Sequence, residues 1–239
     1  LMDQLKPLSL RDRIFVLCMK GLEQGTGRRL SQIAEENLDP SNAVAVWLGP
    51  GHVQEFYRGI PNCMVIDSRR EDVKRRLVQS FSSDLIRFYY GDDLIGNEVG
   101  AAAKNVVGIA AGFLDGKGLS SLKGALMSRG TREVARLIQA MGGSQLSAYG
   151  LCHLGDYEAT VFSRYSHNRQ FGESFIRGET YTDLAEGYYT VEALVLLGQR
   201  YGVELPICQA VHRVLYCGAD PMQELRALLD RNLTREFGE

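Results

Sequence analysis

The chain has little of several residue types whose abundance would define a special class of protein. Its 239 residues include one tryptophan, six prolines and five cysteines, with no internal repeat or low-complexity linker. The cysteines are odd in number, widely spread and form no Cys-x-x-Cys pair, so neither a disulfide framework nor a zinc site is expected. This cysteine usage favours a reducing cytoplasm, and we expect no bound metal.

Long apolar runs and a strong excess of one charge are also absent. No apolar stretch approaches the ~20 residues that a membrane-spanning helix needs, so we expect no stable membrane insertion. The net charge of -2 gives no reason to expect a nucleic acid partner. One basic run between Arg69 and Arg76 is interpreted as the solvated face of a helix, with a nucleic-acid patch as the less favoured alternative.

A complete glycine-rich loop for binding phosphate is missing as well. Gly25-Thr-Gly27 has no third glycine, and the Gly49-Pro-Gly51 turn follows a predicted strand without the full dinucleotide-binding pattern. No P-loop is found. Taken alone, these glycines are more often turns than ligand-binding loops.

The sequence changes in character near residues 90–95. Before this point, short apolar runs alternate with amphipathic stretches, which is the pattern of an α/β sheet with crossovers. The predicted strands are 13–19, 43–48, 62–67 and 86–90, and the predicted helices are 28–37 and 70–81. After this point helical periodicity dominates, over 97–113, 120–141, 169–177, 183–201, 206–216 and 221–232. We therefore expect an α/β domain over residues 1–92 and an all-helical domain over residues 93–239.

Glycines are predicted to end several of these helices, because glycine readily adopts the left-handed conformation of a helix C-terminus. They are Gly112, Gly142, Gly202 and Gly218.

The most informative stretch is residues 96–113, a run of small and aliphatic residues that holds one lysine, Lys104, beside Asn105. Small side chains let a helix pack closely against its neighbours, so Lys104 is expected to be poorly solvated. Removing an ammonium group from water lowers its pKa, and such a lysine can exchange protons with a substrate near neutral pH. The alternative is a lysine that extends to the surface from an otherwise buried helix face.

Two further places resemble parts of a binding site. Lys20 follows the first predicted strand, and open α/β sheets bind ligands beyond the carboxyl ends of their strands. The segments 150–156 and 166–172 bring Asp156, a serine, a histidine, an asparagine and an arginine into glycine-bracketed loops. Each of these residues alone is more often structural, and Asp156 could be a helix N-cap.

Several blocks of residues, in order along nearly the whole chain, resemble the bacterial NAD(P)-dependent glycerol-3-phosphate dehydrogenases. The blocks are Lys20-Gly-Leu-Glu23, Gly49-Pro50, Gly96-Asn-Glu-Val-Gly100 with Lys104-Asn105, Ser128-Arg-Gly130, Leu154-Gly-Asp156, Ser166-His-Asn-Arg169 with Phe171-Gly172, Ala185-Glu-Gly187 and Leu205-Pro-Ile207. The resemblance implies the later part of a Rossmann-type sheet, followed by an all-α domain like the C-terminal domain of 6-phosphogluconate dehydrogenase.

The resemblance also implies an activity and a set of site residues. The activity is reversible hydride transfer between sn-glycerol 3-phosphate and NAD or NADP, which gives dihydroxyacetone phosphate and serves glycerophospholipid synthesis. Lys104 would be the general acid/base, and Asp156 would orient it or hold a substrate hydroxyl. The implied substrate-binding residues are Lys20, Gly49, Asn105, Ser166, His167, Asn168 and Arg169. The implied cofactor-binding residues are Lys20, Val53, His167, Leu184 and Glu186.

The sequence departs from the family pattern at several positions. Family members begin with a Gly-x-Gly-x-x-Gly turn, and this sequence is expected to start after that half of the Rossmann domain. His167 stands where the family has an arginine, which binds phosphate through two parallel hydrogen bonds; Arg169 is an alternative source of that charge. His153 occupies a position where the family usually has glycine. The segment 118–122 looks shorter than the corresponding segment of the family.

These departures leave two alternatives open. One is a related dehydrogenase with a different small hydroxylated substrate, and the other is a catalytically impaired fragment that lacks its cofactor half. The sequence does not distinguish NAD from NADP, because that choice is usually made at the end of the second strand of the sheet. A homodimer is expected from the family, with no direct signal for it in the sequence.

Overall fold

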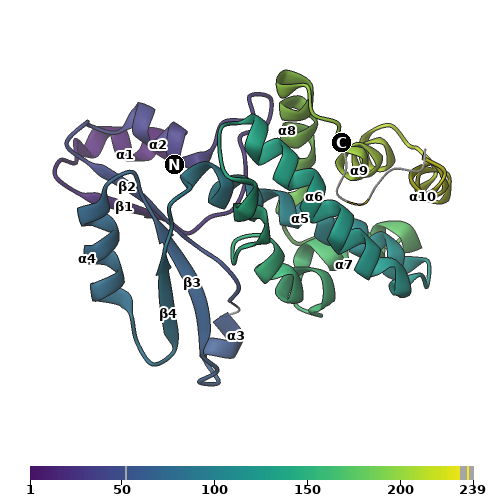
Figure 1. The fold of residues 1–239 in the computed structure, drawn as a ribbon, viewed down its shortest axis with the longest axis horizontal. Helices are drawn as coiled ribbons and strands as arrows, with labels where there is room; N and C mark the ends of the chain where they lie inside the picture. Colours follow the sequence, from purple (N-terminus) through teal and green to yellow (C-terminus); the bar gives the residue numbers. More distant parts are fainter. Residues whose placement is uncertain (52, 232–235, 237–239) are drawn as a thin grey trace.

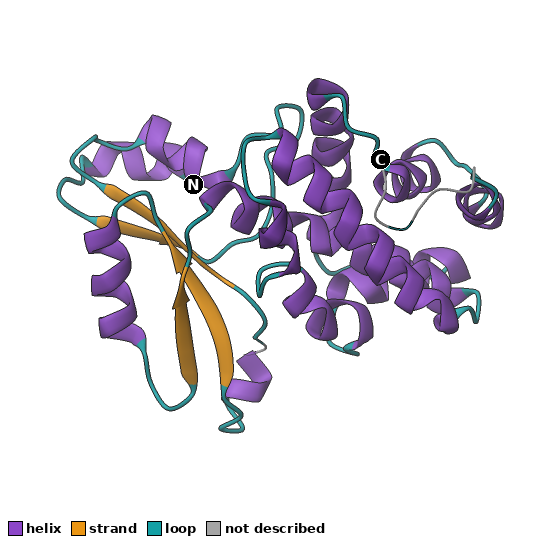
Figure 2. Ribbon diagram, in the orientation of Figure 1, coloured by secondary structure: helices purple, strands orange, loops and turns teal. Residues whose placement is uncertain are grey.

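A small sheet with its flanking helices lies on one side of the molecule, and a larger helical part lies on the other (Figure 1). The structure is a computed structural model, and it describes residues 1–51, 53–231 and 236. The strands are β1 (Ile14–Leu17), β2 (Ala43–Leu48), β3 (Asn62–Asp67) and β4 (Ile86–Tyr90). All the strands precede the helical part in the sequence, and Figure 2 shows them gathered on one side of the molecule. This arrangement confirms the predicted fold class.

The helices divide into a group that accompanies the sheet and a group that follows it. The first group is α1 (Met2–Leu5), the 3₁₀ turn η1 (Lys6–Leu8), α2 (Leu30–Asn37), α3 (Val53–Phe56) and α4 (Glu71–Phe81). The second group is α5 (Leu94–Gly116), η2 (Ser120–Leu122), α6 (Lys123–Ala140), η3 (Gln145–Tyr149), η4 (Leu154–Asp156), η5 (Glu158–Phe162), α7 (His167–Arg177), α8 (Glu186–Tyr201), α9 (Pro206–Tyr216) and α10 (Pro221–Leu229).

The sheet has the strand order β1-β2-β3-β4 and is mixed. The pairs β1–β2 and β3–β4 are parallel, and each is connected through a helix, as the sequence pattern predicts. The pair β2–β3 is antiparallel, which the simple crossover pattern does not anticipate. The connection between these two strands contains only the four-residue helix α3, whereas the helices α2 and α4 in the two parallel connections are longer.

Most predicted elements match the observed ones to within a few residues. The three later strands and α9 have the predicted limits, whereas β1 is shorter and α5 begins earlier. Asp93 explains the early start of α5, because its side chain accepts a hydrogen bond from the N–H of Gly96 and caps the helix. The last predicted helix, 221–232, ends at Leu229, and its final residue lies outside the described residues. The domain boundary between residues 92 and 93 stays a prediction.

The prediction that Gly112 ends a helix is wrong, because it lies inside α5 where α7 crosses. A Cβ on Gly112 would lie 2.1 Å from the carbonyl oxygen of Arg169, and a Cβ on Gly172 would lie 2.3 Å from that of Ile109. The two helix backbones therefore meet at glycine on both sides. Gly202, by contrast, ends α8 in the left-handed conformation, as predicted.

The buried stripe of small residues on α5 positions other functional segments in the same way. A Cβ on Gly108 would lie 2.8 Å from the Thr160 side chain, and a Cβ on Gly187 would lie 2.6 Å from the carbonyl oxygen of Asn105. Close approach therefore brings η5 and the start of α8 against the middle of α5. The consequence is that residues far apart in sequence converge around Lys104.

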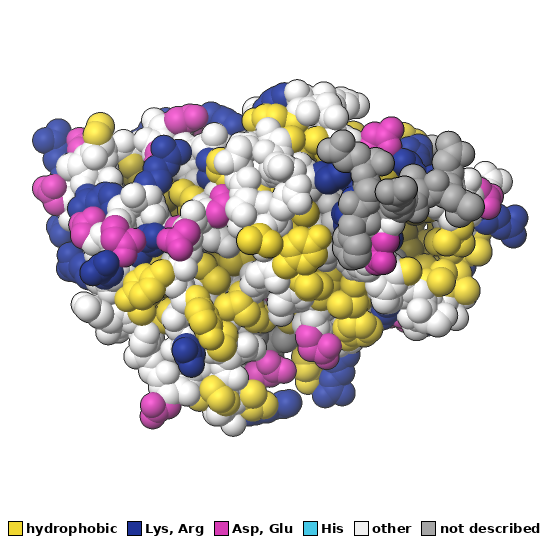
Figure 3. All heavy atoms as spheres, viewed as in Figure 1, with side chains coloured by type: hydrophobic (Ala, Val, Ile, Leu, Met, Phe, Trp, Pro, Cys, Tyr) yellow, Lys and Arg dark blue, Asp and Glu magenta, His cyan; other side chains and the backbone are white. Residues whose placement is uncertain are grey.

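Most of the basic run at α4 is exposed and paired with acidic side chains, as expected, but Lys74 is buried and donates a hydrogen bond of 2.7 Å to the carbonyl oxygen of Gly91. Arg70 pairs with Asp72, Arg75 with Glu71, and Lys74 with both Glu71 and Asp92. Figure 3 shows basic and acidic side chains interleaved on this side of the molecule, with no continuous basic surface in view. Among the described residues, no helix is both long and apolar enough to cross a bilayer.

Candidate active site

Lys104 lies in the middle of α5, and its side chain is only 7% exposed. Its Nζ lies 3.0 Å from Oδ2 of Asp156 and donates a hydrogen bond of 2.7 Å to Oγ1 of Thr160. The structure therefore contradicts the alternative in which this lysine extends to the surface. A buried ammonium group needs such partners, since an isolated one is very costly to remove from water.

Asp156 joins Lys104 to Lys20, which comes from the segment after β1. Nζ of Lys20 lies 2.8 Å from the same Oδ2 of Asp156, and it also donates to the carbonyl oxygen of Gly49 at 3.3 Å. The Asp156 side chain is 1% exposed and lies at the end of the 3₁₀ turn η4. Asp156 is thus a bridging carboxylate, and the alternative that it caps a helix N-terminus is not what the structure shows.

Burial lowers the pKa of Lys104 from 10.5 to about 8. The negative charge of Asp156 opposes this shift, and the positive charge of Lys20 adds to it. The two neighbours therefore act in opposite directions on one amine, while the loss of water sets the overall direction. An amine with a pKa of about 8 can both take up and release a proton at physiological pH.

Asn105 and Glu186 extend this cluster on the other side of Lys104. Nδ2 of Asn105 donates a hydrogen bond of 3.0 Å to Oε2 of Glu186, the first residue of α8. Burial raises the pKa of Glu186, and the positive charges of Lys20, Lys104 and His167 oppose that shift. Glu186 therefore lies within electrostatic reach of three of the predicted site residues.

The start of α7 supplies three more predicted residues. Oγ of Ser166 caps this helix by accepting a hydrogen bond from the N–H of Arg169, and Oδ1 of Asn168 accepts one from the N–H of Gly187 at 2.8 Å. His167 is 58% exposed on its side chain. Its Nδ1 lies 2.8 Å from the hydroxyl of Tyr181 and 3.8 Å from a carboxylate oxygen of Asp183.

The guanidinium of Arg169 points away from this cluster. It contacts Asp115 at 2.9 Å and Glu173 at 2.7 Å. Asp115 lies eleven residues after Lys104 on α5, which corresponds to roughly 16 Å along the helix axis. With its charge neutralised by two carboxylates, Arg169 is a poor source of the phosphate-binding charge that His167 lacks, so its predicted role gains no support.

Three predicted residues remain, of which Gly49 contacts the cluster through its carbonyl oxygen and Lys20. Gly49 follows β2 with a φ of +128°, and a Cβ there would lie 3.2 Å from the backbone of Met64, so this turn requires glycine. Val53 begins α3 and Leu184 precedes α8, and both side chains are exposed. The carboxyl group of Glu186, beside Asn105 and within electrostatic reach of Lys20 and Lys104, is an acceptor that suits the carboxamide of a nicotinamide ring.

Thr160 is a member of the cluster that the sequence analysis missed. Its Oγ1 accepts from Lys104 and donates to the backbone carbonyl of Asp156 at 2.7 Å. The signal was the spacing of four residues from Asp156, which puts both residues on one face of a helical turn. The observed turn is the π-helical η5, and sequence propensity gives little warning of that conformation.

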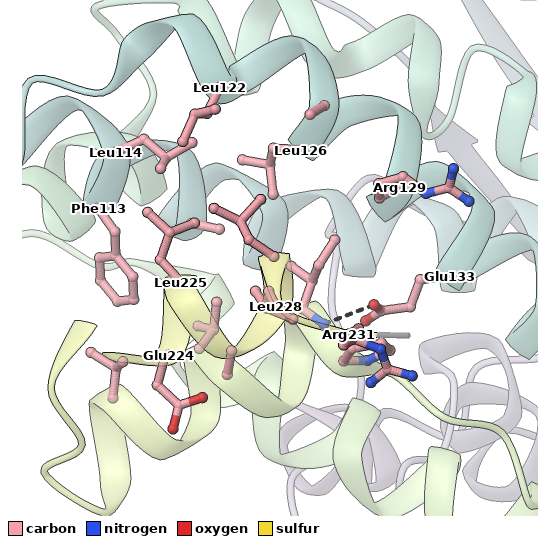
Figure 4. Close-up of a pocket in the computed structure, with 18 of the residues that line it drawn as sticks. Phe113, Leu114, Leu122, Leu126, Arg129, Glu133, Glu224, Leu225, Leu228 and Arg231 are labelled. Carbon is pink, nitrogen blue, oxygen red and sulfur yellow. Dashed lines mark hydrogen bonds between the residues drawn. The ribbon is translucent and has the colours of Figure 1, made fainter. Parts of the chain in front are cut away.

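A spacious hollow lies elsewhere, between α5 and α6 on one side and α9 and α10 on the other (Figure 4). It measures about 1180 Å³, and it is lined mainly by aliphatic side chains such as Leu114, Leu126 and Leu225. None of the predicted site residues lines it. Within the described part of the chain, no group of acidic, histidine or cysteine side chains could hold a metal ion.

Comparison with known proteins assigns the chain to a family. The model of the NAD-dependent glycerol-3-phosphate dehydrogenase C-terminus matches residues 93–226, and that of the N-terminus matches residues 1–74. The Thermus thermophilus glycerol-3-phosphate dehydrogenase [NAD(P)+] is 41% identical over 93% of this chain and 70% of its own length. The Agrobacterium fabrum enzyme of the same name is 36% identical over 96% of this chain and 71% of its own length.

A solved structure agrees with this assignment. The glycerol-3-phosphate dehydrogenase of Coxiella burnetii matches with a TM-score of 0.89 and 30% identity, over 96% of this chain and 73% of that chain. Sequence and fold thus lead to the same result over almost the whole chain, and the chain belongs to the NAD-dependent glycerol-3-phosphate dehydrogenase family.

Proposed function

We propose that this protein is a glycerol-3-phosphate dehydrogenase, which reversibly oxidises sn-glycerol 3-phosphate to dihydroxyacetone phosphate with NAD or NADP. The observation that carries the proposal is the buried amine of Lys104, held 3.0 Å from Asp156 with a pKa of about 8. Family membership supplies the substrate and the cofactor. In the cell the product of the reverse reaction, glycerol 3-phosphate, would serve glycerophospholipid synthesis.

Lys104 transfers the proton in this mechanism. In the oxidation, neutral Nζ takes the proton of the C2 hydroxyl, and in the reduction the ammonium form returns it to the carbonyl oxygen. Asp156 and Thr160 hold the amine from one side, so its orientation is fixed before the substrate binds. A bound nicotinamide cofactor would supply the acceptor for the hydride of C2.

Lys20 stabilises charge on the oxygen as it loses its proton. Its ammonium group shares the carboxylate of Asp156 with Lys104, so the two nitrogens lie close together. A fixed positive charge near a developing alkoxide lowers the barrier, because it requires no rearrangement during the reaction. Asn105, next to Lys104, provides an amide for the neighbouring substrate oxygens.

The start of α7 is the proposed phosphate end of the site. Its backbone N–H groups and helix dipole favour an anion, and His167 and Asn168 are the first residues of that helix. Glu186, Leu184 and Val53 belong to the proposed cofactor side. Lys20, Gly49 and His167 are proposed at the junction between substrate and cofactor.

A direct assay tests this proposal. Protein expressed from the complete natural reading frame is incubated with glycerol 3-phosphate and NAD+ or NADP+. The formation of reduced cofactor is followed by its absorbance at about 340 nm. Turnover that also runs backwards with dihydroxyacetone phosphate is the expected result. Absence of turnover in both directions, with either cofactor, would contradict the proposal.

A second candidate is a related dehydrogenase with a less strongly anionic substrate. The observation that favours it is His167, whose exposed imidazole faces Tyr181 and the carboxylate of Asp183 where a phosphate-binding arginine is expected. Turnover of an unphosphorylated alcohol at a higher kcat/KM than glycerol 3-phosphate would establish this alternative.

We also propose a cytoplasmic location and a homodimer. The five cysteines are free thiols, as expected in a reducing compartment. The dimer is an expectation from the family, and the native mass by light scattering tests it.

A further inference from the structure

A chain of buried hydrogen bonds lies behind Lys104 and plays no part in the mechanism described above. His153 precedes η4, is fully buried, and uses both ring nitrogens. Nδ1 lies 2.8 Å from the carbonyl oxygen of Gly100, and Nε2 lies 2.8 Å from the hydroxyl of Tyr157. The hydroxyl of Thr131 on α6 reaches the same Tyr157 oxygen at 3.4 Å.

The donor and acceptor chemistry of these groups determines the direction of each hydrogen bond. The carbonyl of Gly100 can only accept, so Nδ1 of His153 carries the proton and donates it. Nε2 of the neutral ring is then an acceptor, and it takes the hydroxyl proton of Tyr157. Thr131 in turn donates to the Tyr157 oxygen. Burial lowers the pKa of His153 to about 4, which keeps the ring neutral throughout the physiological range.

The two ends of this chain are attached to the two halves of the catalytic pair. Gly100 lies one helical turn before Lys104, and in an α-helix its carbonyl also accepts the backbone N–H of Lys104. Tyr157 directly follows Asp156 in the sequence. A Cβ on Gly100 would lie 3.0 Å from the Cβ of His153, so glycine allows this close approach. His153 therefore fixes the turn that carries Asp156 against the helix that carries Lys104.

We infer that His153 and Tyr157 are positioning residues, which set the contact between Lys104 and Asp156 through hydrogen bonds to Gly100 and across η4. The inference rests on the proposed function. His153 occupies a position where the family resemblance leads us to expect glycine. The hydrogen bonds of His153 are therefore a feature of this protein and not part of the family pattern. Neither residue touches the reacting atoms.

The predicted consequence concerns the proton affinity of Lys104. The charged and titratable groups that act on Lys104 or respond to its charge are Asp156, Lys20, Glu186, Cys152 and His153. Loosening η4 from α5 has two opposing effects on Lys104: it weakens the contact with Asp156, whose charge raises the pKa, and it admits water. The loss of water is the largest cause of the lowered pKa, so the admitted water decides the direction. The pKa of Lys104 is therefore expected to rise in variants that break the chain of hydrogen bonds.

Three variants test the inference through kcat, KM and the pH profile of glycerol 3-phosphate oxidation. His153→Leu removes both hydrogen bonds of the ring at similar volume. Tyr157→Phe removes the bond to His153 and the longer one from Thr131, with little change in shape. His153→Asn keeps a donor near the position of Nδ1, so it provides a conservative rescue. Val211→Ala, in the core of the helical part, is the control for lost packing.

We expect His153→Leu to lower kcat by about tenfold with little change in KM, and to move the acid limb of the profile upward by about half a pH unit. Tyr157→Phe should move the limb in the same direction by less, and His153→Asn should return it toward the parent value. A limb that stays in place in both His153→Leu and Tyr157→Phe, with kcat reduced no more than in Val211→Ala, overturns the inference.

The activity of the parent protein distinguishes a failure of the proposed function from a failure of the positioning role. If the parent shows no turnover of glycerol 3-phosphate, the proposed function fails. If the parent is active and the variants keep its pH profile, the positioning role alone fails. If His153→Leu does not fold, Tyr157→Phe decides the question, because it retains the ring and the volume of the residue.

Discussion

Lys20 and Lys104 share one oxygen atom, Oδ2 of Asp156, at 2.8 and 3.0 Å. They come from segments more than eighty residues apart, one after β1 and one in the middle of α5. Two ammonium groups at such distances from one carboxylate cannot both be fully compensated, and burial lowers the pKa of Lys104, the more deeply buried of the two. In the proposed mechanism this relationship gives the two lysines different roles, with Lys20 placing its charge beside the substrate oxygen and Lys104 transferring the proton.

The substitution Asp156→Asn tests that separation. It removes the charge that raises the pKa of Lys104 while leaving Lys20, whose charge lowers it. The acid limb of the oxidation profile should therefore move to lower pH, and kcat should fall by about 100-fold because the amine loses its orientation. The measurement is steady-state kinetics from about pH 6 to about pH 10, a range that extends to both sides of the Lys104 pKa of about 8.

Asp115→Asn is the matched control for this experiment. Asp115 is also a largely buried carboxylate bound to two cations, Lys123 and Arg169, but it lies remote from Lys104. This variant should lose thermal stability without a change in the pH profile. A similar shift of the profile in both variants would show that Asp156 acts on global stability only.

The pH dependence of the two reaction directions should be opposite. Oxidation needs the neutral amine, so its kcat/KM should rise through the Lys104 pKa of about 8 and then level off. Reduction needs the ammonium form, so its kcat/KM should fall above the same pH. Measuring both directions on one preparation checks the prediction, and parallel profiles would contradict it.

His167→Arg should tighten the binding of glycerol 3-phosphate. An arginine binds phosphate through two parallel hydrogen bonds and stays charged, whereas histidine is charged mainly below about pH 6.5. A several-fold lower KM is expected, with a smaller effect on kcat. An unchanged or higher KM would mean that the phosphate is bound at another position.

Glu133 provides a prediction about stability that is separate from catalysis. Its buried carboxyl group accepts the N–H groups of Ile207 and Cys208 and so caps the start of α9, beside the hollow in Figure 4. Glu133→Ala leaves both donors unsatisfied in the interior and should cost about 2 kcal/mol of unfolding free energy. Urea denaturation measures this cost, and a loss within the error of the parent value would refute the capping role.

Much of the fold was predictable because it depends on local patterns. Short β-branched runs gave the limits of β2, β3 and β4, and Pro206 marked the start of α9. The antiparallel pairing of β2 with β3 was not predictable from those runs, because strand direction depends on the path of the connection. The continuation of α5 through Gly112 also depends on tertiary structure, namely the crossing with α7.

The site was predictable to a similar degree and for similar reasons. Small residues around Lys104 predicted its burial, and the structure agrees. The shared contact with Lys20 required the folded chain, since neither spacing nor composition relates two such distant segments. Arg169 looked suitable as a phosphate ligand by its type and place, but its ion pairs with Asp115 and Glu173 come from α5 and from its own helix, and only the structure reveals both.

The most direct test of the central claim is the turnover number of Lys104→Ala, measured in oxidation beside a thermal denaturation curve of the same sample. We predict a folded protein whose kcat has fallen by more than about 100-fold, because the proton of the C2 hydroxyl has lost its acceptor. A folded variant that keeps more than about a tenth of the parent kcat, a barrier change of only ~1.4 kcal/mol, would contradict the role of Lys104.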